Sequence, residues 1–517
     1  MTTDTLHQQK VLILDFGSQY TQLIARRIRE LGVYTEIRPF DAKPRDEDRD
    51  LAGLILSGGP DSVYDDDAPQ PSRVWFTGRY PILGICYGMQ WMMREFGGTV
   101  VASDQREYGP ATVHRSSDES RLFRGMEPDQ RVWASHGDRI VTVAPGFTTT
   151  ASSAAAPHAA VEDVERGWYA VQFHPEVVHT IHGTQLLRNF VFEIAGCDGD
   201  WTIASFVEEA IAAVRRQVGD GRVVCGLSGG VDSSVMALLL QRALGDRLTC
   251  IFVNNGVLRK NEADQVLGDF RDKYHLDVRY ADVAEMFLSR LAGVEEPERK
   301  RKIIGETFIE VFEREARASG DARFLAQGTI YPDRIESASV RGPSATIKTH
   351  HNVGGLPDKM HLELVEPLKD LFKDEVRRVG EELGLDPAFV SRHPFPGPGL
   401  AVRILGEVTA ERVALLQEAD HIFIEELRAA DLYDSTAQAF VVLLPVKTVG
   451  VMGDFRTYEY VVALRAVETT DFMTANWARL PHDFLDRVSS RITNEVSGIN
   501  RVVYDITGKP PGTIEWE

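Results

Sequence analysis

One short stretch near the middle of the chain constrains its fold more than any other. Residues 223–227 are an apolar, β-prone run, residues 228–234 read Ser-Gly-Gly-Val-Asp-Ser-Ser, and an apolar run of good helix formers follows. This order predicts a strand, a tight loop and a helix. Two adjacent glycines let the backbone approach an anion, and the free N–H groups of the first helical turn point toward it. The stretch therefore predicts a phosphate-binding loop.

The side chains of this loop suit a phosphate ligand. Ser228, Ser233 and Ser234 offer hydroxyl donors, and Asp232 is a candidate for holding a metal ion that bridges phosphate oxygens. The loop lacks the lysine of the common nucleotide-binding loop, in which Gly, four residues, Gly, Lys and Ser or Thr follow in order. A different nucleotide-binding device is indicated, and an ordinary strand-to-helix turn is the alternative.

The order Ser-Gly-Gly-Xaa-Asp-Ser resembles the pyrophosphate-binding loop of the N-type ATP pyrophosphatases, which split ATP between its α and β phosphates and adenylate a substrate oxygen. The resemblance implies ATP as substrate and Mg²⁺ as cofactor. In that family the end of the next strand lines the adenine pocket, for which plain sheet core is the alternative here. The expected ATP-binding residues are Ser228, Gly229, Gly230, Val231, Asp232, Ser233, Ser234, Val253, Leu258 and, in a later glycine turn, Gly328.

Length, charge and cysteine content narrow the class of protein. A chain of 517 residues is too long for one core and predicts two to four domains. A net charge of −20 argues against a nucleic-acid-binding surface. Four cysteines without a Cys-Xaa-Xaa-Cys pair indicate neither a zinc ribbon nor a disulfide framework. With a polar N-terminus and no long apolar run, we expect a cytoplasmic protein that binds no membrane.

The first 200 residues alternate strand and helix patterns. Residues 11–17 and 51–56 read as buried strands, and residues 20–31 between them read as an amphipathic helix. This alternation predicts a parallel sheet with both faces covered, and the active-site loops are then expected at the carboxyl ends of the strands.

The first of these strand ends carries a cysteine between two glycines. Within residues 81–90 a strand turns sharply into a helix, with Gly84-Ile85-Cys86-Tyr87-Gly88 at the turn. This spacing is the thiol counterpart of the nucleophile elbow, in which glycines tolerate a crowded turn and the nucleophile stands exposed. The N-terminus of the following helix favours the thiolate. A buried cysteine after a strand is the alternative.

Two further strand ends complete a thiol acyl-transfer site. We predict that residues 171–176 form a strand in which His174 and Glu176, two positions apart, face the same way. Glu176 can then orient His174, and His174 can accept the proton of Cys86. Residues 57–60 form a glycine loop able to turn N–H groups toward an oxyanion.

Together, these residues make residues 11 to about 195 resemble the class I, triad-type glutamine amidotransferases. The resemblance implies that the cysteine attacks the carboxamide of glutamine, releases ammonia and forms a glutamyl thioester that water hydrolyses. By residue match, Cys86 is the nucleophile, His174 the base and Glu176 its orienter. Gly59 and the backbone N–H of Tyr87 are the implied oxyanion donors.

The rest of the chain contains a cover, a link and a small sheet. Residues 348–357, with two adjacent histidines, are expected to form a flexible cover. Residues 367–377 are expected to begin a helix with a cation in its first turn, where the helix dipole disfavours one, so Lys373 is a candidate for binding a substrate phosphate; a solvated helix face is the alternative. Residues 393–403, rich in proline and glycine, predict a rigid, non-regular link at a domain boundary. The strands and helix beyond it predict a small α+β unit suited to dimerisation, and the proline-stiffened tail is expected to dock and close a ligand pocket.

This last region, with both of its proline-rich segments, resembles the C-terminal domain of the glutamine-hydrolysing GMP synthetases, and the resemblance then covers essentially the whole chain. It implies a homodimer that aminates xanthosine monophosphate (XMP) through an adenylated intermediate, with release of AMP, pyrophosphate and glutamate. The phosphate of XMP is assigned to Arg403 and Lys509, and a base or ribose edge to Glu515. The XMP residues expected are Lys373, Arg403, Lys509, Ile514 and Glu515.

The fold expected is two parallel-sheet α/β domains plus a small α+β C-terminal domain. The amidotransferase domain is placed at residues 1–199, the ATP pyrophosphatase domain at 200–392, and the dimerisation and XMP-binding domain at 393–517. Another glutamine-dependent synthetase with a different acceptor is the alternative enzyme. A nucleotide sensor with degenerate sites is the alternative of another class, and the intact cysteine, histidine, glutamate and phosphate loop argue against it.

Overall fold

The computed structural model describes residues 9–116, 119–333, 362–452, 455–469, 472 and 474–517. It divides into two compact units, one built on residues up to Glu209 and the other on Ala210–Tyr331 and the described residues from 362 onward. The cover expected at residues 348–357 lies outside the described residues. Of the helices in the described part of the chain, none has the length and apolar character needed to cross a bilayer.

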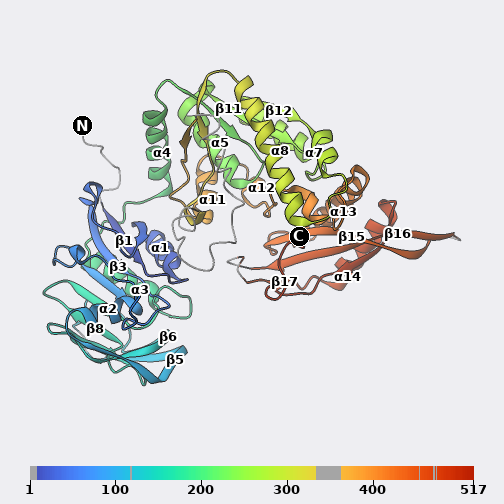
Figure 1. Ribbon diagram of the computed structural model, residues 1–517. Coiled ribbons are helices and arrows are strands. Elements are labelled where there is room, and N and C mark those ends of the chain that lie inside the picture. The colour runs from blue at the N-terminus through green and yellow to red at the C-terminus, as the bar shows by residue number, and fades with distance from the viewer. Residues whose placement is uncertain (1–8, 117–118, 334–361, 453–454, 470–471, 473) are drawn as a thin grey trace. The chain divides into compact units, whose positions relative to one another are not determined.

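The first unit is built on a nine-stranded sheet of order β2-β1-β3-β4-β9-β8-β7-β5-β6 (Figure 1). The pairs among β2, β1, β3, β4 and β9 are parallel, whereas those among β9, β8, β7, β5 and β6 are antiparallel. Its elements are β1 (Lys10–Asp15), α1 (Thr21–Glu30), β2 (Tyr34–Pro39), η1 (Asp46–Asp48), β3 (Leu51–Leu56), η2 (Arg73–Trp75), β4 (Ile82–Ile85), α2 (Tyr87–Glu95), β5 (Thr99–Arg115), β6 (Asp129–Thr142), β7 (Thr148–Ser152), β8 (Ala160–Asp163), β9 (Trp168–Val171), α3 (Gly183–Arg188) and η3 (Asn189–Ile194).

The sheet of the first unit confirms the parallel sheet predicted from the sequence and extends it. The strands β2, β1, β3, β4 and β9 pair in parallel, and β8, β7, β5 and β6 add an antiparallel extension that the sequence analysis did not predict. In β6, buried residues alternate with exposed or partly exposed ones. This pattern is typical of an antiparallel strand with one face toward the core, whereas β1 is buried along its middle like a central parallel strand.

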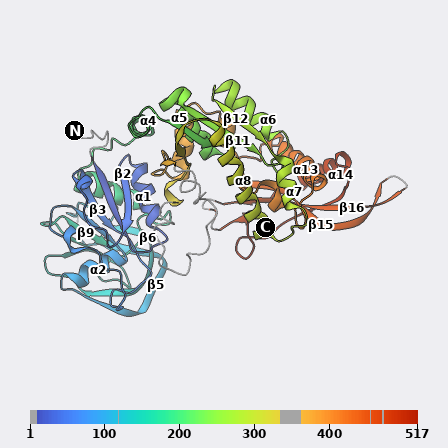
Figure 2. The same ribbon diagram turned by 45° about the horizontal axis from the view of Figure 1, so that its top comes forward.

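The second unit contains a parallel sheet of order β12-β11-β10-β13-β14 and a smaller mixed sheet of β15 to β18 (Figure 2). Its elements are α4 (Ile203–Val218), which begins before the unit boundary, β10 (Arg222–Gly226), α5 (Val231–Leu244), η4 (Gly245–Arg247), β11 (Leu248–Asn254), α6 (Glu262–Leu267), η5 (Gly268–Lys273), β12 (Val278–Asp282), α7 (Ala284–Leu291), α8 (Pro297–Ala318), β13 (Ala322–Ala326), β14 (Glu363–Val365), α11 (Lys373–Glu382), α12 (Pro387–Val390), η6 (Gly399–Arg403), α13 (Ala410–Ala429), β15 (Gln438–Met452), β16 (Phe455–Glu468), β17 (Asn476–Trp477), α14 (His482–Glu495) and β18 (Ile499–Tyr504).

Local sequence explains where key helices of the second unit begin. Gly230 is the N-cap of α5, whose residues are mostly buried, as expected of a helix that is apolar on nearly all sides. At α8, the carboxylate of Glu296 accepts hydrogen bonds from the N–H groups of Glu298 and Arg299, and Pro297 occupies the first position. Both helices therefore have well-defined starts.

One hydrophobic cluster connects the two sheets of the second unit. It contains Val224 and Ile251 of the parallel sheet, Leu400 of η6, and Leu443 and Val462 of the smaller sheet. The segment 393–403 was expected to be non-regular, yet its last five residues form η6, in which Leu400 is fully buried. The link is thus part of the core, because its apolar residues fill the space between the sheets. The domain bounds stay a prediction.

Candidate active sites

Cys86 occupies a strained turn between β4 and α2. Its φ is +50°, a region that L-residues with a side chain rarely adopt. Its N–H donates to the carbonyl of Val171 on the neighbouring strand (2.8 Å). A Cβ added to Gly88 would lie 2.5 Å from the carbonyl oxygen of Leu56, and one added to Gly84 would lie 2.9 Å from the amide of Met89. Both glycines are therefore required by close packing around the elbow.

His174 and Glu176 lie in a turn, which corrects the strand predicted for residues 171–176. The strand β9 ends at Val171, and the N–H of His174 donates to Trp133 O (2.9 Å) outside the ladder of β9. Pro175 has no N–H with which to continue a strand. The His174 Nδ1 nevertheless lies 2.7 Å from Glu176 Oε1, and both side chains are buried. The pair is thus brought together by the turn and not by strand alternation.

The charge state of His174 depends on its two partners. Burial lowers the pKa of His174, but its hydrogen bonds with Cys86 and Glu176 and their negative charges outweigh burial and raise it to about 11. Because Nδ1 faces Glu176, the other ring nitrogen is left for Cys86. This arrangement stabilises an imidazolium beside a thiolate, the reactive form of a nucleophilic cysteine.

The glycine loop after β3 borders this pair. A Cβ on Gly58 would lie 3.3 Å from His174 Cε1 and 3.7 Å from the Cβ of Cys86. One on Gly59 would lie 2.9 Å from the carbonyl oxygen of Phe16, so the loop is closely packed on its other side too. Tyr87 is the first residue of α2, and its N–H belongs to the turn in which helical N–H groups have no helical acceptor. Tyr87 directly follows Cys86, and a Cβ on Gly59 would lie 3.3 Å from the ring of Tyr87.

The phosphate loop joins β10 to α5, as the sequence predicts. Ser228 Oγ lies 2.9 Å from Ser233 Oγ, and Ser233 Oγ accepts the N–H of Ser228 (3.2 Å). Gly229 has φ +75°, and a Cβ there would lie 2.8 Å from Val266. Ser234 differs from the other two serines because it is buried; its hydroxyl donates to Gly230 O (2.7 Å), as the hydroxyl of Ser233 also does (3.1 Å). Its side chain supports the loop from behind.

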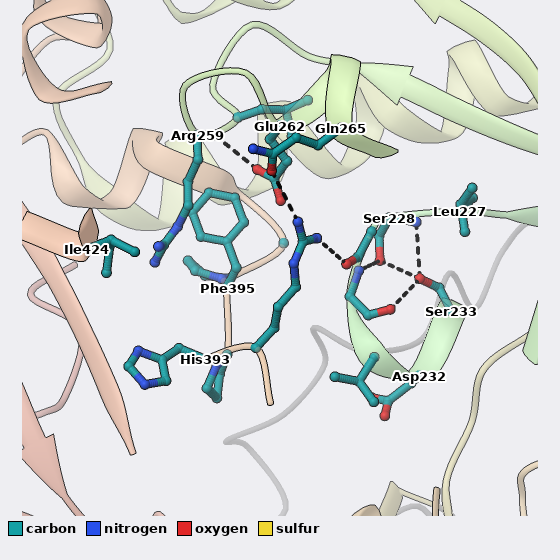
Figure 3. Close-up of a pocket in the computed structure, with 18 of the residues that line it drawn as sticks. Leu227, Ser228, Asp232, Ser233, Arg259, Glu262, Gln265, His393, Phe395 and Ile424 are labelled. Carbon is teal, nitrogen blue, oxygen red and sulfur yellow. Dashed lines mark hydrogen bonds between the residues drawn. The ribbon is translucent and has the colours of Figure 1, made fainter. Parts of the chain in front are cut away.

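A cavity of about 620 Å³ opens in front of the loop (Figure 3). Of the predicted ATP residues, Ser228 to Ser233, Val253 and Leu258 line it, whereas Ser234 and Gly328 do not. Gly328 lies behind the loop, with a Cβ position 3.9 Å from Asp232. The walls also carry six cationic side chains, of which only Lys373 was predicted: Arg259, Lys260, Lys373, Arg377, Arg392 and Arg428. Such a wall suits a polyanionic ligand.

Lys373 and Asp232 form an ion pair at the edge of this cavity. The ammonium lies 2.6 Å from Asp232 Oδ2, and Asp232 Oδ1 is buried without a hydrogen-bond partner among the described residues. Lys373 was grouped with the XMP residues, but the structure places it at the phosphate loop. Within the described ranges no three His, Cys, Asp or Glu side chains gather as a metal-binding group. Magnesium is often held by one or two carboxylates plus substrate phosphates, so Asp232 fits it.

The segment around the link supplies residues that sequence reasoning missed. The guanidinium of Arg392 donates to Gly229 O (2.9 Å) and so holds the phosphate loop from across the cavity. The ring of His393 stacks on Tyr433 at 3.8 Å between centroids, and burial lowers its pKa to about 4. Figure 3 shows Arg259, His393 and Phe395 on the side of the cavity facing the loop. The only sequence signal for them was the rigid proline-rich segment itself, interpreted as a boundary.

Apart from Lys373, the predicted XMP residues fall into two groups. Arg403 is fully buried, and its guanidinium binds both carboxylate oxygens of Glu515 (3.1 and 2.8 Å), while Ile514 packs in a small cluster with Phe440. Lys509 instead lines a second cavity of about 530 Å³, where its ammonium donates to Phe472 O (2.8 Å). The tail is docked as expected, but Arg403, Ile514 and Glu515 line neither of these two cavities in the described part of the chain.

Three family models match successive parts of the chain, and full-length relatives match all of it. A class I glutamine amidotransferase model matches residues 12–194, an NAD synthase model residues 203–302, and a GMP synthase C-terminal domain model residues 425–516. Glutamine-hydrolyzing GMP synthases of Vibrio vulnificus and Alkalilimnicola ehrlichii are 56% and 59% identical to the chain, with all of both chains covered. A solved glutamine amidotransferase from Thermotoga maritima is 18% identical over 37% of this chain and 99% of its own, with a TM-score of 0.30. With such identity to full-length relatives, this chain belongs to the family of glutamine-hydrolysing GMP synthases.

Proposed function

We propose how the residues of this chain divide the work of the glutamine-dependent conversion of XMP to GMP, the reaction of its family. The contact that carries the proposal is the buried pair of His174 Nδ1 and Glu176 Oε1 at 2.7 Å, beside a cysteine at a strained elbow. A carboxylate that fixes a histidine next to a thiol is the arrangement needed for acyl transfer.

In the first half-reaction, Cys86 Sγ attacks the carboxamide carbon of glutamine. The N–H groups of Gly59 and Tyr87 stabilise the oxyanion, and His174 gives its proton to the leaving nitrogen, so that ammonia departs and a glutamyl thioester forms. A water molecule then attacks the thioester and gives a proton to His174, and glutamate leaves as the thiolate is restored. Glutamine and water are thereby converted to glutamate and ammonia.

In the second half-reaction, ATP binds in the cavity at the phosphate loop. The 2-oxygen of XMP attacks the α-phosphorus, pyrophosphate leaves, and an adenylated XMP results. Ammonia then attacks C2 and AMP leaves, which yields GMP. Ser228, Ser233 and the loop N–H groups bind phosphate oxygens, and Val253 and Leu258 contact the adenosine part of ATP. Lys373 leaves its ion pair with Asp232 and binds a phosphate of ATP. Gly328 and Ser234 support the loop from behind.

Asp232 is the residue that would hold Mg²⁺ together with the phosphate oxygens. When bound, the ion neutralises the charge that develops on the leaving pyrophosphate. The orphaned, buried Oδ1 of Asp232 supports this assignment, because a carboxylate oxygen without a partner is costly unless a cation completes it.

For XMP we propose Arg403, Ile514 and Glu515 at the docked tail and Lys509 at the neighbouring cavity. The bidentate pair of Arg403 with Glu515 supports the assignment, since it gives the Glu515 carboxylate a defined direction. Lys509 offers a cation for the phosphate of the nucleotide.

A homodimer is proposed from the long hairpin of β15 and β16. Val449, Val451, Phe455 and Tyr458 are each more than half exposed on it, and Phe455 is 79% exposed. Apolar side chains gathered in this way indicate an interface, and a second copy of the chain can cover the same patch by two-fold symmetry. Sedimentation velocity tests the proposed homodimer: the unaltered chain is expected to sediment as a dimer and the Phe455→Glu variant as a monomer. The expected cytoplasmic location rests on the family's biosynthetic role and stays a prediction.

The experiment that tests the division of labour uses Cys86→Ala. The variant is expected to lose glutamine-dependent GMP formation and to keep the rate obtained with ammonium salts, because only the thioester step needs the sulfur. Cys197→Ala removes another buried thiol of the same unit and should change neither rate. Loss of the ammonium-dependent rate in Cys86→Ala would contradict the assignment of separate sites.

A further inference from the structure

Lys300 is a fully buried lysine of α8 that the half-reactions above do not use. Its side chain has no exposed surface, and its ammonium donates to Ala401 O (3.3 Å), Ile404 O (2.7 Å) and Glu517 Oε2 (2.5 Å). A buried ammonium is tolerated only when its donors are satisfied, and here each of its three hydrogens has an acceptor. The three acceptors belong to two segments of chain far from α8 in sequence.

The position of Lys300 on its helix argues that these contacts are the reason for it. Lys300 lies in the first turn of α8, where the helix dipole disfavours a cation. The helix start already has its own cap in Glu296 and Pro297. Lys300 is therefore not needed to begin the helix, and the free energy cost of burying its charge is offset by its contacts with the two segments that it joins.

The two segments that Lys300 joins are those that carry the Arg403–Glu515 pair. Ala401 and Ile404 lie on either side of Arg403 in and after η6, and Glu517 follows Glu515 by two residues. The neighbouring Arg301 donates to the main-chain oxygen of Glu517 (2.5 Å), which holds the same end of the tail. The mark for the C-terminus lies beside one end of α8 in both views (Figures 1 and 2). Each half of the pair is thus tied to one rigid helix.

Two further hydrogen bonds, closer to Glu515, also hold the C-terminal tail in place. The tail therefore does not depend on Lys300 alone. Gln438 Nε2 donates to Glu515 Oε1 (2.6 Å), and the indole of Trp516 donates to Asp505 Oδ2 (3.0 Å). Loss of Lys300 would therefore loosen the geometry of the carboxylate without releasing the tail.

We propose that Lys300 is a positioning residue for XMP: by tying η6 and the tail to α8, it sets the geometry in which Arg403 and Glu515 meet the nucleotide. The inference rests on the assignment of Arg403 and Glu515 to XMP made above. Removing Lys300 raises the KM for XMP and leaves the KM for ATP and the glutaminase rate unchanged.

The test uses the full-length enzyme with ammonium as nitrogen source, so that the Cys86 site does not enter. For Lys300→Met we expect the KM for XMP to rise about 10- to 100-fold, since small misplacements of binding groups have effects of that order. Glu517→Gln keeps a hydrogen-bond acceptor for Lys300 but loses the carboxylate charge, so its KM for XMP should rise less than that of Lys300→Met. Because Lys300 and Glu517 act as one unit, the double variant should be no worse than Lys300→Met alone.

Lys302→Met is the matched control, because Lys302 is on the same helix, is 73% exposed, and among the described residues forms an ion pair with Glu306 alone, at 4.0 Å. It should leave every constant unchanged. Arg403→Met tests the assignment beneath the inference: an unchanged KM for XMP there refutes the XMP site. If Arg403→Met raises that KM and Lys300→Met does not, the positioning role is wrong.

A rise in the KM for both ATP and XMP, together with a lowered melting temperature, would show a purely structural role and overturn the inference. If Lys300→Met does not fold, Glu517→Gln decides in its place, with a rise in the KM for XMP alone as support and unchanged constants as refutation.

Discussion

The contact between His174 and Glu176 makes a quantitative prediction about the reactivity of Cys86. Glu176→Gln removes the carboxylate charge and keeps the shape, so the imidazolium loses its buried partner at 2.7 Å. A hydrogen bond to a charged group is worth about 1.5–3 kcal/mol. At 1.36 kcal/mol per factor of ten, the equilibrium constant for forming the thiolate–imidazolium pair from the neutral thiol and imidazole falls about 10- to 150-fold.

The sign of the pH dependence follows from the raised pKa of His174. Its folded pKa of about 11 lies above the ordinary value of 6.5. The stabilisation from the protonated ring is therefore fully present below pH 6.5 and is lost as the pH rises through about 11. In Glu176→Gln the folded pKa is lower, so the loss begins at lower pH and the free energy of unfolding falls sooner on the alkaline side.

Alkylation by iodoacetamide, followed by mass spectrometry at Cys86, measures the thiolate directly. The rate at pH 7 is expected to fall in Glu176→Gln, by up to about 150-fold, as part of the ion pair converts to the neutral thiol. Cys197 is an internal reference, since burial raises its pKa to about 12 and it should react slowly in both proteins. Glu162→Gln is the matched control, because Glu162 is buried in the same unit and bonds to Ser120. An equal rate at Cys86 in Glu176→Gln and the unaltered chain would refute the reasoning.

Three further predictions follow from other contacts. Gly88→Ala should lower the free energy of unfolding by about 1–3 kcal/mol and impair glutaminase activity, because the added Cβ would lie 2.5 Å from Leu56 O. Gly305→Ala has open space around the added Cβ and should not destabilise the protein, and chemical denaturation of both variants checks this. Asp232→Asn should abolish AMP release from ATP and XMP with ammonium and leave the labelling of Cys86 unchanged; continued AMP release at the normal rate would contradict the metal and phosphate assignment. Asp48→Asn should lower the free energy of unfolding by about 1.5–3 kcal/mol at pH 7, since the buried Arg38 loses the charge of one carboxylate partner, at 2.6 Å, and keeps the other, Glu36. The pKa of Asp48 is lowered because Arg38, Arg45 and Lys10 outweigh burial, so its contribution is present above about pH 3.8 and is lost as the pH falls, which thermal unfolding across pH 3–7 measures.

The amino-acid sequence by itself determined the features that depend on neighbouring residues. The strand, loop and helix around Ser228 and the elbow at Cys86 were predictable because glycine positions, apolar runs and helix starts act within a few residues. The two parallel-sheet units and the small C-terminal sheet follow from the same patterns and are confirmed. The resemblance to a family contributed the substrates, which no local pattern specifies.

Only the tertiary structure decided which distant side chains meet. His174 and Glu176 were chosen correctly as neighbours, but a turn after β9 and not a strand sets their contact. Arg392 reaches Gly229 across the cavity, and Lys300 reaches Glu517, over separations of 163 and 217 residues. Such contacts depend on how buried faces pack into a common core, as in the cluster that contains Val224, Leu400 and Val462. Packing over such distances is a property of the whole chain, and no short window of sequence encodes it.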